Sequence, residues 1–311
     1  MTSPRARLIV NPSSGRERGV EHAATLAGGL RRKYAGAEVF FTQGDRDAEQ
    51  AAQQALTDGC SAIFVAGGDG TLNEVVNGIA AVNALDAVHF GIVPLGTGND
   101  FASALGIPHE TDEALEVLLR GELLDVDLGR VNGRVFLNTS GGGYVAEVSL
   151  AVTPQLKTIA GRLAYLIGGA QALLEYEPVR ARVKVDPGDV TFDLGLYAYA
   201  VCNSRLIGGG RLIAPDAIID DGLLDVCLIE EMSAMEFVAL GRKVADGGHV
   251  DDPRVHYLQG ASVTLDFERD TNINTDGEVL SATHAEYQVL PRAARFLVGD
   301  APFAASNATA G

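Results

Sequence analysis

The sequence has few cysteines, no tryptophan and no long hydrophobic run. Its 311 residues include three cysteines, Cys60, Cys202 and Cys227, which lie far apart and show no CxxC or CxxH spacing. Such a set supports neither a disulfide framework nor a zinc site, so we expect a protein of the reducing cytoplasm. No apolar run approaches the roughly 18 residues of a membrane-spanning helix, and the amino end lacks the apolar core of a signal peptide. The chain is therefore expected to be soluble, with at most peripheral contact with a membrane.

Basic residues are also scarce. The chain has 24 Lys and Arg against 41 Asp and Glu, which gives a formal net charge of −17. A surface this acidic repels the phosphates of nucleic acid, which excludes nucleic acid as an expected partner. Residues 151–215 are an exception, with seven basic and five acidic side chains. A solvated face is the simplest interpretation of that stretch.

The length and the order of the elements predict two domains. The chain is about twice the roughly 150 residues of a common domain. Over residues 1–128, β-type runs alternate with helical patterns, which predicts a parallel sheet with helices on its faces. The β-type runs are Arg7–Val10, Glu38–Phe41, Ala62–Val65 and His89–Val93, and the helical patterns are Val20–Tyr34, Asp47–Leu56, Leu72–Val82 and Asp100–Leu105.

From residue 129 to residue 290, β-type runs dominate and predict a second, mostly antiparallel domain. These runs are Val135–Asn138, Arg182–Val185, Gly195–Cys202, Leu223–Ile229, Ser262–Phe267 and Val279–Ser281. One helical interval, with the apolar segment Leu163–Leu174, interrupts them and is too short to span a bilayer. Residues 291–311 are expected either to return to the first domain or to fray.

The strongest local signal is AIFVAGGDGTLNEVVN at Ala62–Asn77. Glycines between a strand and a helix let backbone N–H groups approach an anion, and the helix presents its positive end. Asp69 among these glycines would repel a phosphate unless a cation lay between them. The motif therefore favours a metal–nucleotide complex over a plain tight turn.

A second strand–glycine–helix element, VPLGTGNDFASALG at Val93–Gly106, carries Asp100 near its helix start. Because the loops of a parallel sheet gather at the carboxyl ends of its strands, both elements are expected at one edge. The chain contains no GxxxxGK[ST] motif, and the GxGxxG pattern fails at Phe101. Walker-type and dinucleotide sites are therefore not favoured.

A third element, NINTDGEVL at Asn272–Leu280, lies far along the chain. Its Asp-Gly pair is typical of a β-hairpin turn followed by a surface glutamate. The alternative is that Glu278 is a general base that receives a hydroxyl proton. Local sequence leaves both interpretations open.

These motifs together resemble the diacylglycerol kinase catalytic family, which includes bacterial soluble lipid kinases and relatives of the sphingosine kinases. GGDGT alone is shared with NAD kinases and phosphofructokinases, whereas GTGND with a late DGE is much more specific. The resemblance covers nearly the whole chain. It is carried by NPSSG at Asn11–Gly15, GGDGTLNEVVNG at Gly67–Gly78, PLGTGNDFA at Pro94–Ala102, APDAIIDDGLLDV at Ala214–Val226 and TDGE at Thr275–Glu278.

The resemblance implies an ATP-dependent lipid kinase, with ATP held between an N-terminal α/β domain and a C-terminal β-sandwich. It makes Glu278 the base, and Asp69, Asp100 and Asp127 an acidic shell that holds Mg²⁺ and water near the phosphates. For Thr42, an ordinary strand-end threonine stays an open alternative. The implied nucleotide contacts are Asn11, Ser13, Ser14, Gly15, Thr42, Gly67, Gly68, Asp69, Gly70, Thr71, Asn73, Gly96 and Thr97.

The resemblance also implies a second, structural Mg²⁺ held by Asp221 and the backbone carbonyls of Ile218 and Leu223. The alternative there is an Asp-Gly hairpin with a solvated acidic pair. Leu163–Leu174, with Lys157 and Arg162 beside it, would either rest on a lipid surface during transient membrane association or pack as a core helix.

Two other functions stay open at this stage. One is a soluble-metabolite kinase like NAD kinase, and the other is a non-catalytic nucleotide- or lipid-binding protein. The sequence does not define which lipid is phosphorylated, whether ATP is preferred over other nucleotides, or whether the chain forms a homodimer.

Overall fold

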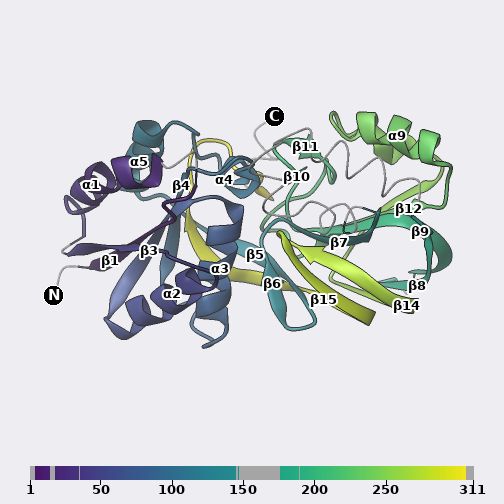
Figure 1. The fold of residues 1–311 in the computed structure, drawn as a ribbon, viewed down its shortest axis with the longest axis horizontal. Coiled ribbons are helices and arrows are strands. Elements are labelled where there is room, and N and C mark those ends of the chain that lie inside the picture. Colours follow the sequence, from purple (N-terminus) through teal and green to yellow (C-terminus); the bar gives the residue numbers. More distant parts are fainter. Residues whose placement is uncertain are drawn as a thin grey trace.

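The computed structural model describes residues 4–14, 18–34, 36–144, 146, 176–188 and 190–305. The expected helix at Leu163–Leu174, with Lys157 and Arg162, lies outside these residues, and so does Gly15. The molecule is elongated, with most of its helices in one half and most of its long strands in the other (Figure 1). No helix in the described ranges is long and apolar enough to cross a membrane.

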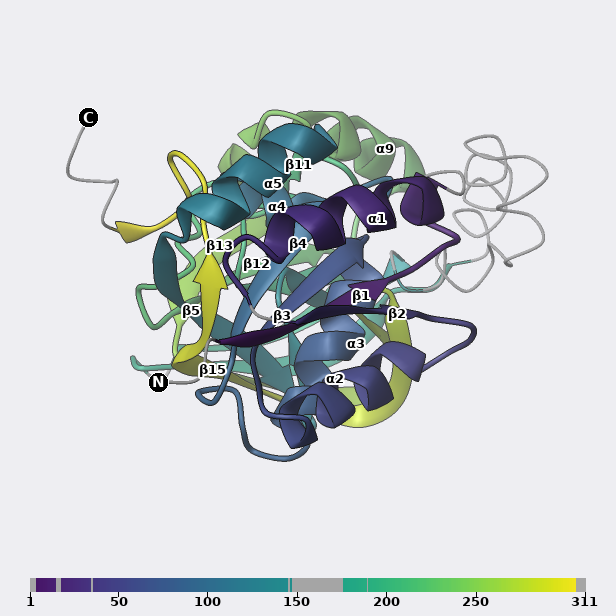
Figure 2. The ribbon, with the colours of Figure 1, turned by 90° about the vertical axis from the view of Figure 1, so that its left-hand side faces the viewer.

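The amino-terminal half is a parallel sheet covered on both faces. β1 pairs in parallel with β2 and β3, and β3 with β4. Figure 2 shows α1 and α5 on one face of this sheet and α2 and α3 on the other. The elements are β1 (Arg5–Val10), α1 (Arg18–Leu30), β2 (Ala37–Phe41), α2 (Asp47–Thr57), β3 (Cys60–Gly67), α3 (Asp69–Ala80), β4 (His89–Pro94), α4 (Asp100–Ala104) and α5 (Thr111–Arg120).

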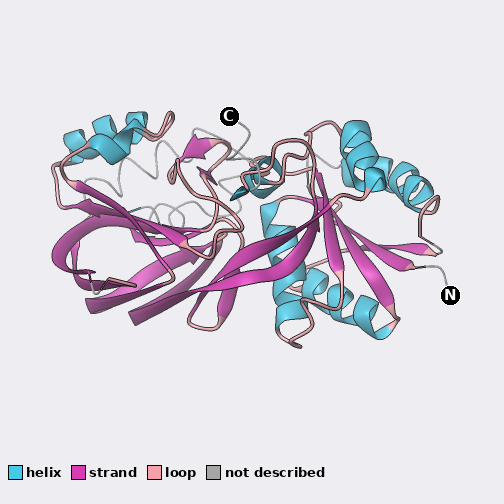
Figure 3. Cartoon of the chain, turned by 180° about the vertical axis from the view of Figure 1, so that it is seen from behind, coloured by secondary structure: helices cyan, strands magenta, loops and turns pink. Residues whose placement is uncertain are grey.

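Strands dominate the carboxyl-terminal half, and most of them pair antiparallel (Figure 3). They are β5 (Leu123–Val131), β6 (Arg134–Phe136), β7 (Thr139–Gly143), β8 (Val179–Asp186), β9 (Val190–Cys202), β10 (Leu206–Ile207), β11 (Arg211–Leu212), β12 (Leu224–Glu230), β13 (Val255–Gly260), β14 (Ser262–Thr275) and β15 (Glu278–Leu297). The helix α9 (Ala234–Lys243) and a short 3₁₀ turn (Gly248–Asp251) complete this half. The predicted fold class, a parallel α/β half followed by a mainly antiparallel β half, is confirmed.

β15 links the two halves. Its first part pairs with β14, and its register against β5 shifts between Leu290 and Ala294. After the shift, Arg295 and Phe296 pair in parallel with β4. The same strand therefore contributes Tyr287 to the core of the β half and Phe296 to the core of the α/β half.

Two helices are absent from the sequence expectations. α5 buries Ala114, Leu115 and Leu118 against the sheet and ends at Gly121, whose φ of 76° is a left-handed conformation that glycine adopts readily. α9 begins with a capping box, in which Ser233 and Glu236 bond each other's backbone N–H groups. The serine–x–x–glutamate spacing of that box is visible in the sequence and could have predicted the helix start.

Candidate active site

The two glycine turns lie against each other at the carboxyl ends of β3 and β4. Leu95 N–H donates a 2.9 Å hydrogen bond to the carbonyl of Gly67. A Cβ on Gly96 would lie 2.6 Å from the Cα of Gly68, a separation that real Cβ atoms essentially never show. Only glycine at this position lets the turns approach so closely, which explains why both turns carry it.

Asp69, the first residue of α3, joins the first turn to the second. Its carboxylate accepts hydrogen bonds from the N–H groups of Asp100 (3.2 Å) and Phe101 (3.0 Å). Burial raises the pKa of the Asp69 carboxyl, and the nearby charge of Asp100 raises it further. Two carboxylates are thus held close together at the starts of α3 and α4.

Asp100 in turn holds a loop from the β half. Its carboxylate accepts N–H donors from Gly209 (3.0 Å) and Gly210 (2.8 Å), and the Asp100 residue is 6% exposed. Both glycines have positive φ angles, 85° and 97°, so this loop conformation is one that other residues rarely adopt. The acidic side chain therefore connects the two halves.

The remaining nucleotide residues expected from the sequence lie at the same edge. Asn11 follows β1, and its side-chain amide donates to Thr71 Oγ1 at 3.0 Å while its Oδ1 accepts Ser13 N–H at 3.0 Å. Thr42 follows β2, and its N–H donates to Val10 O. Ser13 and Thr97 are exposed, and Ser14 and Thr42 are half-buried.

The Asp-Gly turn between β14 and β15 docks onto α3. Thr275 pairs with Glu278 across the hairpin, and Asp276 and Gly277 have positive φ angles of 47° and 102°. The hairpin interpretation is therefore correct as far as the backbone is concerned. The Asp276 carboxylate accepts a hydrogen bond from the side-chain amide of Asn73, at 3.0 Å.

Three consecutive backbone N–H groups also point at Asp276. They belong to Leu137 (2.6 Å), Asn138 (3.2 Å) and Thr139 (3.1 Å). Burial raises the pKa of the Asp276 carboxyl to about 6, and the negative charge of Asp69 also raises it. In the sequence, the Asp-Gly pair marks Asp276 only as a turn residue, and no local signal shows which donors surround its carboxylate.

Glu278 is exposed at the first position of β15. Its charge acts on Arg46, whose pKa is raised chiefly by the hydrogen bond and charge of Glu49 and further by Glu278 and Glu74. Glu74 belongs to α3 and Arg46 precedes α2. Glu278 therefore lies within electrostatic reach of the helix that follows the first glycine turn.

Asp127 falls into a second acidic group. It is fully buried on β5, and its carboxylate accepts the N–H groups of Gly222 (2.6 Å) and Arg292 (2.6 Å). Burial raises the pKa values of Asp127 and Asp221, and the charge of Asp220 adds to both.

The expected structural metal residues lie in this second group. Asp221 Oδ1 accepts Leu223 N–H at 3.0 Å, and Ile218 lies in the same turn before β12. Within the described part of the chain, no cluster of three or more His, Cys, Asp or Glu side chains has the arrangement of a metal site. A divalent cation here would need backbone carbonyls, phosphates or water as further ligands.

Comparison with known proteins identifies relatives over nearly the whole chain. Residues 5–131 match the model of the diacylglycerol kinase catalytic domain, and residues 140–298 match the YegS C-terminal NAD kinase beta sandwich-like domain. A diacylglycerol kinase of Bacillus subtilis (strain 168) is 34% identical over 275 residues, which are 88% of this chain and 89% of the relative. A diacylglycerol kinase of Staphylococcus saprophyticus is 33% identical over 274 residues, 88% of each chain.

Solved structures show the same fold. A crystal structure from Bacillus anthracis str. Sterne superposes with a TM-score of 0.81 at 24% identity, covering 97% of this chain and 98% of the other. A second crystal structure from that organism, of a diacylglycerol kinase, gives a TM-score of 0.74 at 20% identity and covers 97% and 99%.

Proposed function

The chain belongs to the diacylglycerol kinase family, and from this membership we propose that it transfers the γ-phosphoryl group of ATP to the hydroxyl of diacylglycerol, or of a related glycerolipid or sphingoid base. The predicted family, and with it a lipid kinase that uses ATP, is confirmed by these relatives. The observation that carries the proposal for this chain is that the Asp276–Glu278 turn docks on α3, the helix that directly follows the first glycine turn.

The triphosphate would lie over the two glycine turns and the start of α3. Gly70 is exposed, and nothing lies within 4 Å of the place where its side chain would be, so there is room for a phosphate at the start of α3. The backbone of Gly67, Gly68 and Gly96 and the exposed hydroxyls of Ser13 and Thr97 line the same edge. Helix starts and glycine turns bind phosphate because their N–H groups and dipole favour negative charge.

Three of the expected nucleotide residues would act by positioning the site, namely Asn11, Thr71 and Asn73. Asn73 is 1% exposed and its amide donates to Val135 O and Asp276, so it holds the hairpin. Thr71 is 7% exposed and accepts the hydrogen bond from Asn11. These contacts fix the turn around the phosphates. Thr42, which follows β2, and Ser14, in the loop after β1, would border the nucleotide.

Asp69 and Asp100 fit a magnesium–nucleotide complex. Two neighbouring carboxylates whose charges repel are stabilised by a cation, and Mg²⁺ is commonly bound by one or two carboxylates together with substrate phosphates and water. When bound, Mg²⁺ neutralises charge on the phosphates and favours the departure of ADP. Asp69 and Asp100 would orient that complex through carboxylates that the backbone N–H groups already hold in place.

Glu278 would accept the proton of the attacking lipid hydroxyl. The hydroxyl oxygen forms a bond to the γ-phosphorus, the bond from that phosphorus to the β–γ bridging oxygen breaks, and ADP leaves. Asp276 holds the turn, so the base is presented from the β half to the phosphates of the α/β half. A positioned general base contributes about 10²–10⁴-fold in rate.

A second Mg²⁺ is proposed at Asp221, with the carbonyls of Ile218 and Leu223. The three acidic residues Asp127, Asp220 and Asp221 interact unfavourably through their charges. A hard cation beside Asp221 relieves that repulsion. This ion would stabilise the loop before β12, and Asp127 would support the loop through its bond to Gly222.

The lipid is proposed to arrive by transient contact with a membrane surface, since its acyl chains keep it there. The proposed contacts are the apolar segment Leu163–Leu174 and the basic Lys157 and Arg162 beside it. A homodimer is a further proposal, and sedimentation velocity tests it.

The test is an assay with radiolabelled ATP and a panel of acceptors. Dispersed diacylglycerol, phosphatidylglycerol and a sphingoid base form the lipid arm, and NAD forms the soluble arm. We expect Mg²⁺-dependent labelling of a lipid and none of NAD. Labelling of NAD alone would replace the proposal with a soluble-metabolite kinase, and ATP binding without labelling of any acceptor would indicate a binding protein.

A further inference from the structure

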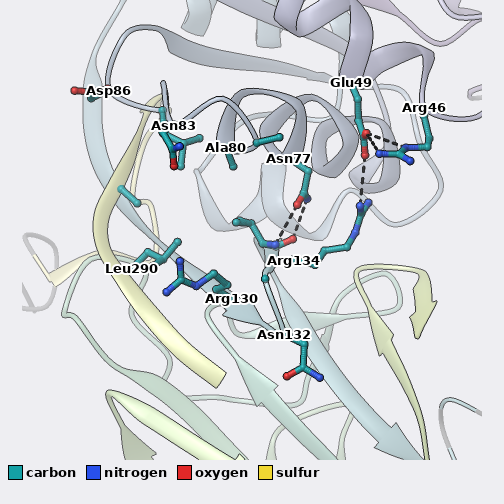
Figure 4. A pocket seen from close by; sticks show the side chains of 15 residues that line it. Arg46, Glu49, Asn77, Ala80, Asn83, Asp86, Arg130, Asn132, Arg134 and Leu290 are labelled. Atoms are coloured by element: carbon teal, nitrogen blue, oxygen red, sulfur yellow. Dashed lines mark hydrogen bonds and ion pairs between the residues drawn. The ribbon is translucent and has the colours of Figure 1, made fainter. Parts of the chain in front are cut away.

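A cavity of about 740 Å³ opens between the two halves, beside the active site described above. It is lined by the end of α3, the segment from α3 to β4, the β5–β6 hairpin and the register shift of β15 (Figure 4). No residue of either glycine turn lines it. Its volume falls in the range of roughly 300–1,000 Å³ that is typical of small-molecule sites.

From the charges of this cavity we infer that it binds a small molecule that carries a phosphomonoester. Three arginines line it, Arg46, Arg130 and Arg134, against the acidic Glu49 and Asp86. Both Arg46 and Arg134 pair with Glu49, at 2.7 and 3.4 Å. Figure 4 shows Asp86 at the edge of the group with its carboxylate turned away. In a chain of net charge −17, the cavity is locally basic.

Arg130 supplies an uncompensated positive charge. Its guanidinium donates a hydrogen bond to the neutral side-chain oxygen of Gln288, and no carboxylate in the described residues pairs with it. Arginine presents several N–H donors in one plane, so a guanidinium with one neutral partner has donors left for a phosphate.

Arg134 is engaged with the protein itself, on the face of the β5–β6 hairpin opposite to Arg130. Its Nη1 donates to Glu49 and its Nη2 to Asn73 Oδ1, whereas its buried Nε has no hydrogen-bond partner. Because this Nε is buried, a ligand in the cavity does not reach it. Arg134 therefore holds Glu49 and Asn73 in place at the wall, and Arg130 is the arginine that faces a ligand with free donors.

The rest of the lining suits an organic group attached to the phosphate. Ala80, Leu85, Leu290 and Ala293 contribute apolar surface. The side-chain amide of Asn83 lies at the same wall (Figure 4). The combination of the Arg130 guanidinium with a small apolar wall fits a compact phosphate ester better than a bare inorganic ion.

The position of the cavity makes such a ligand a bridge between the halves. α3 and the segment after it belong to the α/β half, whereas Asn132 lies in the β5–β6 turn and Arg134 directly follows it. Leu290 and Ala293 lie at the register shift where β15 passes from one core to the other, and Arg292 between them has a φ of 47°. A ligand here contacts both sides of this passage.

A single tryptophan tests the inference without any kinase assay. The chain contains no tryptophan, so Ala81→Trp, at an exposed position of the cavity wall, reports from this place alone. We expect a saturable fluorescence change with glycerol 3-phosphate in solution or with phosphatidic acid in phosphatidylcholine vesicles. The arm that responds identifies a soluble or a lipid source of the phosphomonoester.

Arg130→Gln in the Ala81→Trp protein should weaken the response about ten- to a hundredfold, because a hydrogen bond to a charged group is lost. Arg182→Gln, at an exposed arginine on β8, is the matched control and should leave it unchanged. Calorimetry on the chain without the tryptophan repeats the comparison. The inference would be overturned if neither ligand gave a saturable fluorescence change, or if Arg130→Gln bound the ligand as tightly as its parent. Displacement of the bound ligand by ADP with Mg²⁺ would overturn it too.

Discussion

The side-chain amide of Asn73 donates a 3.0 Å hydrogen bond to the carboxylate of Asp276, a residue 203 positions later in the chain. Asn73 lies in the first turns of the helix that follows GGDG, and Asp276 begins the turn that carries Glu278. The same amide also donates to Val135 O at 3.1 Å. One buried side chain thus fixes the turn that carries Glu278, the proposed base, to the start of α3, where the triphosphate is proposed to bind.

Replacement of the base should reduce turnover and little else. For Glu278→Gln we expect a loss of about 10²–10⁴-fold in kcat, since the amide cannot accept the hydroxyl proton. ATP affinity should stay nearly unchanged, as measured by calorimetry. Glu286→Gln, at another exposed glutamate of β15, is the control and should keep full activity. Wild-type turnover in Glu278→Gln would remove the assignment.

Asp276 should make the stability of the protein depend on pH. Its pKa is about 6 in the folded chain, above the ordinary 3.8, so the folded state binds this proton more tightly than the unfolded state. Its contribution to the free energy of unfolding is therefore greatest at low pH and declines as pH rises through about 6. Asp276→Asn has no carboxyl to ionise and lacks this decline.

Urea unfolding at about pH 4.5 and about pH 7 measures the effect. Wild-type stability minus that of Asp276→Asn should be smaller at the higher pH. A difference that grows with pH would show that the hydrogen bonds from Leu137, Asn138, Thr139 and Asn73 stabilise the charged form more than burial destabilises it.

The close approach of the two glycine turns predicts opposite outcomes for two alanine variants. Gly96→Ala places a methyl group 2.6 Å from backbone of Gly68, so we expect a loss of about 1–3 kcal/mol in the free energy of unfolding. Gly70→Ala has no neighbour within 4 Å and should keep the stability, since alanine favours a helix.

ATP affinity distinguishes a loss of phosphate binding from a loss of stability. In Gly70→Ala the methyl group occupies the open space at the start of α3, so ATP should bind more weakly to a protein of normal stability. Calorimetric titration with ATP and urea unfolding are measured on the same samples. Unchanged ATP affinity in Gly70→Ala would move the triphosphate away from this helix start.

Magnesium should stabilise the chain through Asp221 even without nucleotide. A ligand that binds only the folded state raises stability with its concentration, so added Mg²⁺ should raise the Tm of the wild type. Asp221→Asn should largely lose that increase, whereas Asp216→Asn, at an exposed aspartate before the same turn, should keep it. An equal rise in Tm for all three proteins would place the ion elsewhere.

Much of the fold was predictable because its signals are local. The strands β1 to β4 alternate with α1 to α4 at nearly the expected residues, since apolar runs, glycine turns and helix starts follow from neighbouring residues. α9 was missed although its capping box was there to read, and α5 was missed although its apolar residues recur at helical spacing.

The site was only partly predictable, because local signals do not show which distant residues meet. Asp69 and Asp100 follow glycine turns on adjacent strands, so their proximity follows from the parallel sheet. That Asp127 belongs to the same acidic shell stays a prediction from the family resemblance, and the course of β5 adds that its carboxylate accepts the N–H groups of Gly222 and Arg292. No local pattern encodes which backbone N–H groups surround a carboxylate.

The sequence by itself determined the family, the glycine turns and the identity of the acidic residues, because each depends on residue type and on short spacing along the chain. Only the tertiary structure decided that Asp276 would bind Asn73, that Asp127 would accept the N–H groups of Gly222 and Arg292, and that three arginines would line one cavity. Those contacts join residues far apart in the chain, and their distances are set by how β5 and β15 pass between the two cores.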